Sequence, residues 1–67
     1  MNSVELLEAV LPSNLLLHIQ SSETYRQYLR LSNERCIAAE YLQAEVEYTC
    51  LLNEVINDKR FKQHYIN

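Results

Sequence analysis

The sequence predicts an all-α protein, a helical hairpin that assembles as an oligomeric helical bundle, in the simplest case a dimer. Its 67 residues contain no glycine and one proline, and 48% of them are hydrophobic. Glycine is the usual residue of left-handed helix ends and tight turns, and proline is the usual helix breaker. A chain without glycine, and with only Pro12 to break it, is expected to form long helices with few interruptions, in one domain over residues 1–67.

A short N-terminal helical arm is expected over residues 3–20, where apolar residues recur at spacings of three and four. Pro12 disfavours a helical backbone at Leu11, so the proline divides the arm into two pieces. Residues that are preferred at helix N-termini stand at the start of each piece: Ser3 for the first, and Ser13 or Asn14 for the second.

One long helix is expected over residues 23–57, with Ser22 as its N-terminal cap. Ser32 and Asn33 form a weaker candidate break, because both residue types prefer caps to helix interiors. With that break, Asn33 caps a helix that begins at residue 34. Without it, a single helix of about 35 residues would be ~52 Å long. The helical pattern has no obvious stop before residue 57, so we favour near-continuity.

The C-terminal end, residues 58–67, contains three of the six basic residues. Cations in a final helical turn complement the negative end of the helix dipole, which is a purely structural explanation for them. A contact site for an acidic partner is the alternative.

The long helix carries apolar residues around most of its circumference, so we expect it to have neighbours on at least two sides. The main seam repeats at spacings of four and three, and with the residues beside it forms the predicted interface: Ile37, Tyr41, Ala44, Tyr48, Leu51, Leu52, Val55 and Ile56. A line of smaller, mixed residues follows the same spacing elsewhere: Tyr25, Leu29, Ser32, Cys36, Ala39, Gln43, Val46 and Cys50. The remaining acidic stripe is a candidate contact face: Glu40, Glu47 and Glu54.

The arm is much shorter than the long helix, and this mismatch is the main argument for assembly. An arm that folds back at residues 21–22 covers mainly the first half of that helix, so Tyr48 and Leu52 would stay exposed. Burying one such large apolar side chain is worth about 1.5–3 kcal/mol. We therefore expect a protein partner, either a second copy in a homodimer or a different protein. Tyr25 and Tyr28 face another way and are candidates for a second contact.

No motif for catalysis, metal binding or cofactor binding is found. His18, Cys36, Cys50 and His64 each lie 14 or 18 residues from the next, whereas zinc ligands come in close pairs. A phosphate-binding loop of the P-loop or dinucleotide type needs glycine. The cysteines are expected to be buried and reduced, although an antiparallel self-pairing would place Cys36 opposite Cys50 of the other copy. We expect no enzyme activity, no metal and no cofactor.

The net charge of −3 argues against a nucleic-acid-binding protein, which needs a basic surface. No apolar run approaches the roughly 20 residues needed to span a bilayer, and the first residues lack the positive region of a signal peptide. We expect a cytoplasmic protein with neither nucleic acid nor membrane as partner. The acidic stripe also disfavours a helix that lies on a membrane surface, because such helices are rich in lysine and arginine.

The function that these features favour is protein–protein interaction, as a small adaptor, regulator or chaperone-like subunit that buries an apolar helix face. The alternative is an acidic inhibitor that presents its acidic stripe to the basic surface of a nucleic-acid-binding protein. Four acids and no base between Cys36 and Asn57 support this alternative. Salt-sensitive capture of a basic partner would favour the inhibitor, and salt-insensitive self-association would favour the interaction module.

Overall fold

The computed structural model describes residues 2–58 and confirms the predicted all-α class. These residues contain no strand and form four helices: α1 (Ser3–Val10), α2 (Ser13–Gln20), α3 (Glu23–Asn33) and α4 (Ala38–Ile56). The predicted basic end over residues 58–67 lies outside the described residues except for Asp58.

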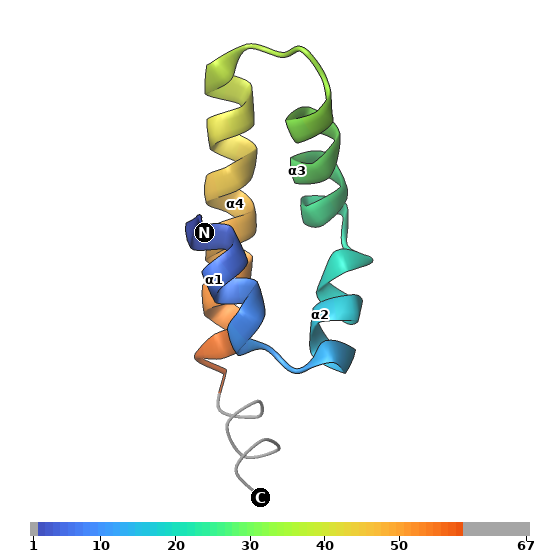
Figure 1. The fold of residues 1–67 in the computed structure, drawn as a ribbon, viewed down its shortest axis with the longest axis vertical. Coiled ribbons are helices and arrows are strands. Elements are labelled where there is room, and N and C mark those ends of the chain that lie inside the picture. Colours follow the sequence, from blue (N-terminus) through green and yellow to red (C-terminus); the bar gives the residue numbers. More distant parts are fainter. Residues whose placement is uncertain (1, 59–67) are drawn as a thin grey trace, which may run out of the picture.

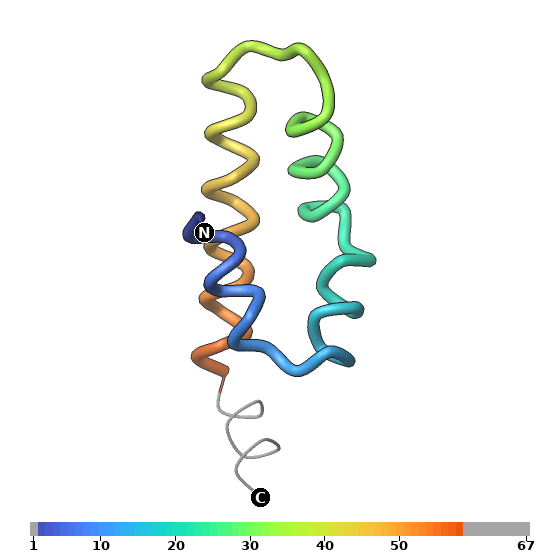
Figure 2. Tube along the Cα trace, viewed as in Figure 1, coloured from blue at the N-terminus to red at the C-terminus, as the bar shows by residue number. Residues whose placement is uncertain are grey.

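The longest helix, α4, is the axis on which the other helices are arranged (Figure 1). α3 packs antiparallel along the N-terminal half of α4, and α1 lies against its C-terminal half. α2 follows the direction of α3 and contacts it. Figure 2 shows the same path as a trace, in which the chain reverses once between α1 and α2 and again between α3 and α4. The N-terminal arm therefore returns to the C-terminal half of the longest helix.

α1 begins one residue earlier than predicted, and α2 one or two residues earlier. Asn2, and not Ser3, is the N-cap of α1, and its side-chain oxygen accepts a hydrogen bond from the backbone N–H of Glu5 at 2.9 Å. Pro12 occupies the N-cap position of α2 without a side-chain cap hydrogen bond, so the predicted caps of this piece lie inside the helix. The backbone of Leu11 is extended, as expected for a residue before proline.

Ser22 caps α3 as predicted, since its hydroxyl oxygen accepts a hydrogen bond from the backbone N–H of Tyr25 at 3.2 Å. We expect Ser22→Ala to destabilise the protein by about 0.5–2 kcal/mol, because the substitution leaves that N–H without its partner. Urea unfolding followed by circular dichroism measures this loss. Ser13→Ala, at a position with no side-chain cap hydrogen bond, is the control; an equal loss in both variants would contradict the assignment.

The near-continuous helix predicted over residues 23–57 is wrong, and so is the prediction that Asn33 caps its second part. Asn33 is the last residue of α3, and residues 34–37 connect it to α4. Glu34 and Ile37 have extended backbones, with φ and ψ of −104° and 157° at the first and −68° and 132° at the second. No described residue has a positive φ. Because the residue after α3 and the residue before α4 are both extended, the chain reverses here without the left-handed conformation that favours glycine.

This reversal decides where the core forms. The main core lies where α1 and α2 meet the C-terminal half of α4, and its buried members are Val4, Leu11, Ile19, Tyr48 and Leu52. Half-buried apolar side chains of all four helices pack around them, among them Leu7, Leu16, Tyr28 and Val55. The arm thus covers the half of the longest helix that it was expected to leave open.

Candidate protein-interaction surface

Most of the predicted interface either belongs to the core of the chain or packs against it. Tyr48 and Leu52 are 0% exposed, and Ala44 is also buried. The other members are half-buried or exposed: Tyr41, Leu51, Val55 and Ile56 are half-buried and Ile37 is exposed. The seam does form one face of α4, but the prediction that its C-terminal half stays exposed is wrong, because the arm lies on it.

Four of the five tyrosines form one cluster between α3 and α4. The ring of Tyr28 stacks on that of Tyr48 with centroids 5.0 Å apart, and Tyr25 approaches Tyr48 from α3 at 5.1 Å. Tyr41 extends the cluster, with its ring centroid 6.0 Å from that of Tyr28. Aromatic pairs at these distances add to the stability of a core. Tyr25 and Tyr28 therefore pack inside the chain, and their prediction as a second outside contact finds no support in this geometry.

A hydrogen bond inside the core joins α1 to α4. The Tyr48 hydroxyl donates to a carboxylate oxygen of Glu8 at 2.7 Å, and the Gln20 amide of α2 approaches the same oxygen at 3.5 Å. Burial raises the pKa of the Tyr48 phenol well above its ordinary value, and the hydrogen bond to Glu8 and the charge of that carboxylate raise it further. This bond satisfies the polar end of a side chain that is otherwise surrounded by apolar groups.

Tyr41 lies nearer the solvent. Its hydroxyl donates to the Glu45 carboxylate at 3.0 Å. Hydrogen bonding to Tyr28, and then to Glu45, raises the pKa of Tyr41 to about 12. In both tyrosines of the seam the raised pKa extends the neutral form of the phenol to a higher pH than in the unfolded chain.

The side of α4 that faces away from the core carries an exposed apolar row, which we call the outward face: Ala39, Leu42, Val46 and Cys50. Its two large members are 54% exposed at Leu42 and 59% exposed at Val46. Val46 lies two residues from both Ala44 and Tyr48, and two residues along a helix turn the side chain by about 200°. The outward face is therefore opposite the buried seam. Three of its residues, Ala39, Val46 and Cys50, belong to the line of smaller residues found in the sequence. The spacing of residues along a helix could not show which of the two apolar lines would remain exposed to solvent.

The predicted acidic stripe runs beside the outward face. Glu40, Glu47 and Glu54 are all exposed. Within residues 2–58, the two ion pairs join α3 residues to acids outside α4: Arg26 to Glu23, and Arg30 to Glu34. α4 itself contains no basic residue. The three carboxylates are therefore not neutralised by a cation of the described chain.

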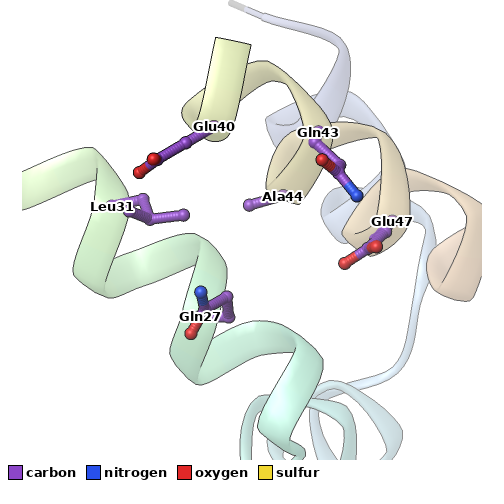
Figure 3. Close-up of a pocket in the computed structure, with 6 residues that line it drawn as sticks. All are labelled: Gln27, Leu31, Glu40, Gln43, Ala44 and Glu47. Carbon is purple, nitrogen blue, oxygen red and sulfur yellow. The ribbon is translucent and has the colours of Figure 1, made fainter. Parts of the chain in front are cut away.

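A groove with a volume of about 280 Å³ opens between α3 and α4, beside the acidic stripe. Leu31 and Ala44, which are 6% and 3% exposed, point toward each other across it (Figure 3). The polar side chains around it come from both helices: Gln27 from α3, and Glu40, Gln43 and Glu47 from α4. We call this the α3–α4 groove. It combines a small apolar floor with a negatively charged rim. Sequence patterns alone do not predict this groove, because it depends on how α3 crosses α4.

Both cysteines are free. The Cys36 thiol donates to the carbonyl oxygen of Leu31 at 3.3 Å and is half-buried, whereas Cys50 is exposed, contrary to the prediction that both are buried. Cys36 lies in the connection before α4, so no continuous helix carries the self-pairing register that would place it opposite Cys50. No group of three His, Cys, Asp or Glu side chains that could hold a metal ion occurs within residues 2–58.

Comparisons with protein-family models, with curated proteins and with solved structures find no match to this chain. In the described part of the chain, none of the helices is both long enough and apolar enough to cross a membrane.

Proposed function

We propose that this protein is a small protein–protein interaction module, an adaptor, regulator or chaperone-like subunit, that binds its partner through the outward face of α4. The observation that carries the proposal is the exposure of Leu42 and Val46, at 54% and 59%, on a helix whose opposite side already packs in the core. Each such side chain gains free energy when it is removed from water. A helix face with apolar residues at this spacing is a recurrent mode of partner recognition.

The proposal replaces the interface that the sequence indicated. Tyr48 and Leu52 belong to the folded chain, so a partner contacts the opposite side of the same helix. The exposed, free thiol of Cys50 on this face is compatible with a reducing compartment such as the cytoplasm. The partner is a second copy or a different protein, and no reaction is assigned to the chain.

The double substitution Leu42→Gln and Val46→Gln tests this function. We expect the variant to keep its helix content and, within about 1 kcal/mol, its stability, because both side chains are exposed and glutamine is a good helix former. It should lose the proteins that the unaltered chain captures from its native cell, or lose self-association in light scattering. Leu17→Gln, at an α2 residue that is 68% exposed, is the matched control and should keep both. Equal capture and equal mass in all three proteins would contradict the proposal.

A further inference from the structure

We infer that the partner of the outward face is a basic amphipathic helix, one whose apolar stripe is bordered by arginine or lysine. The inference rests on the proposed function and adds the chemistry of the partner. Two neighbouring features carry it, the uncompensated charge beside the outward face and the α3–α4 groove.

The charge beside the outward face has one sign. α4 carries four carboxylates, at Glu40, Glu45, Glu47 and Glu54, and no base. Glu45 accepts the hydrogen bond of Tyr41, whereas the other three make no hydrogen bond or ion pair within residues 2–58. A partner that buries Leu42 and Val46 brings its own flanking residues close to Glu47 and Glu54. If these flanking residues of the partner are cations, they attract the carboxylates of Glu47 and Glu54, whereas acidic residues there would be repelled.

The same charge argues against a second copy as the occupant. If α4 packed on α4 of another molecule through the outward face, each helix would bring its acidic stripe of Glu40, Glu47 and Glu54, and no base of its own, to the border of the contact. Like charges that are brought together on packed helices are destabilising. None of the basic residues within residues 2–58 lies on α4: Arg26 and Arg30 are on α3 and pair with Glu23 and Glu34, and Arg35 lies in the connection that precedes α4. A different chain with the opposite charge fits this face better.

The α3–α4 groove suits a long cationic side chain of that partner. Its volume of about 280 Å³ lies just under the range of roughly 300–1,000 Å³ that is typical of small-molecule sites. Arginine and lysine lay their methylene stems on apolar surface and keep the charged group at a polar rim. Leu31 and Ala44 form only a narrow apolar floor, so the groove would hold such a side chain mainly through the acceptors Glu40 and Glu47 at its rim (Figure 3). Arginine is the better match, since its planar donors also reach the amide oxygens of glutamines.

Two synthetic helical peptides test the inference on the whole chain. They share one leucine stripe at spacings of three and four, and differ only in the residues that border it, arginine in one and glutamate in the other. We expect the arginine peptide to bind, measured by fluorescence anisotropy, and the affinity to fall at least tenfold, an order-of-magnitude figure, between about 50 mM and about 500 mM NaCl. The glutamate peptide should not bind.

The variants assign the binding to this surface. Glu40→Gln with Glu47→Gln should weaken the arginine peptide roughly tenfold at low salt. Glu5→Gln with Glu23→Gln removes the same net charge elsewhere, on exposed residues of α1 and α3, and should change the affinity less than about twofold. Leu42→Gln with Val46→Gln should abolish binding.

Three results would overturn the inference: equal binding of the two peptides, no binding of either, or an effect of Glu5→Gln with Glu23→Gln as large as that of the groove variant. A dimer that forms through Leu42 and Val46 and excludes the arginine peptide would also overturn it, in favour of a second copy. The proposed function is tested by a different experiment. It is contradicted only if partner capture and self-association do not depend on Leu42 and Val46.

Discussion

Replacing Leu52 by alanine is expected to destabilise the protein by about 2–5 kcal/mol, the range for a fully buried leucine. Leu52 is 0% exposed and lies in the cluster where Val4, Leu11 and Ile19 meet α4. Removing its side chain leaves a cavity that the surrounding helices can fill only in part. For a chain of this size, each kcal/mol lowers the melting temperature by about 4–8 °C. Thermal and urea unfolding followed by circular dichroism measure the effect.

Leu17→Ala is the matched control for Leu52→Ala, because Leu17 is 68% exposed on α2. Its effect should stay within about 0.5 kcal/mol. The pair also decides whether the core forms within one chain. If Leu52 instead lay between two copies, the melting temperature would rise with protein concentration and the substitution would lower the native mass. The expected result is a native mass that Leu52→Ala leaves unchanged, whether or not the chain also associates through the outward face.

The second large effect is a loss of stability at alkaline pH that depends on Tyr48. Burial and the hydrogen bond to Glu8 raise the pKa of the folded Tyr48 phenol above the value of about 10 that it has in the unfolded chain. The unfolded state therefore releases this proton first. The stabilisation is fully present below pH of about 10, and it is lost as the pH rises toward the folded pKa, at about 1.4 kcal/mol per pH unit.

Tyr48→Phe should make the free energy of unfolding less dependent on pH above about 10, because phenylalanine has no proton to release. The variant should also be less stable at neutral pH, since Glu8 loses the hydrogen bond that joins α1 to α4. Urea unfolding at a series of pH values, with tyrosinate absorbance recorded in parallel, measures both effects.

Tyr41→Phe is the comparison variant for this experiment. The pKa of Tyr41 is also raised, to about 12, but Tyr41 is only half-buried and solvent screens its interactions, so most of the alkaline loss should remain. If Tyr48→Phe keeps the full pH dependence and Tyr41→Phe removes it, the assignment to the core tyrosine is wrong.

Helical periodicity predicted part of the buried side of α4 correctly, although Ile37, which it also placed in the seam, precedes the helix and is exposed. Ala44, Tyr48 and Leu52 recur at spacings of four, and all three are buried together. The same periodicity placed Ala39, Val46 and Cys50 on a second line, and these are exposed. Spacing along a helix determines relative orientation, because each residue turns by a constant angle. It contains no information on which line another segment will cover.

Which apolar line of α4 is covered depends on where the chain reverses between α3 and α4. The weaker break predicted at Ser32 and Asn33 lies just before the observed one, since the chain leaves the helix at Glu34 and resumes it only at Ala38. Residues 34–37 include no glycine or proline, so the sequence contains no residue that is typical of a turn there. A backbone with negative φ is open to every residue type, so composition could not exclude a reversal there. Moving the reversal from residues 21–22 to residues 34–37 shifted α1 to the other half of the longest helix.

The sequence by itself determined the helical class, the cap at Ser22, the break at Pro12 and the two apolar lines and acidic stripe of α4, because these depend on local backbone preferences and on the constant turn of a helix. Only the tertiary structure decided that Tyr48 and Leu52 are core, that Leu42 and Val46 stay in contact with water, and that Leu31 meets Ala44 across a groove rimmed by Glu40 and Glu47. Those outcomes depend on which helices meet, and contacts between distant segments are set by the path of the whole chain.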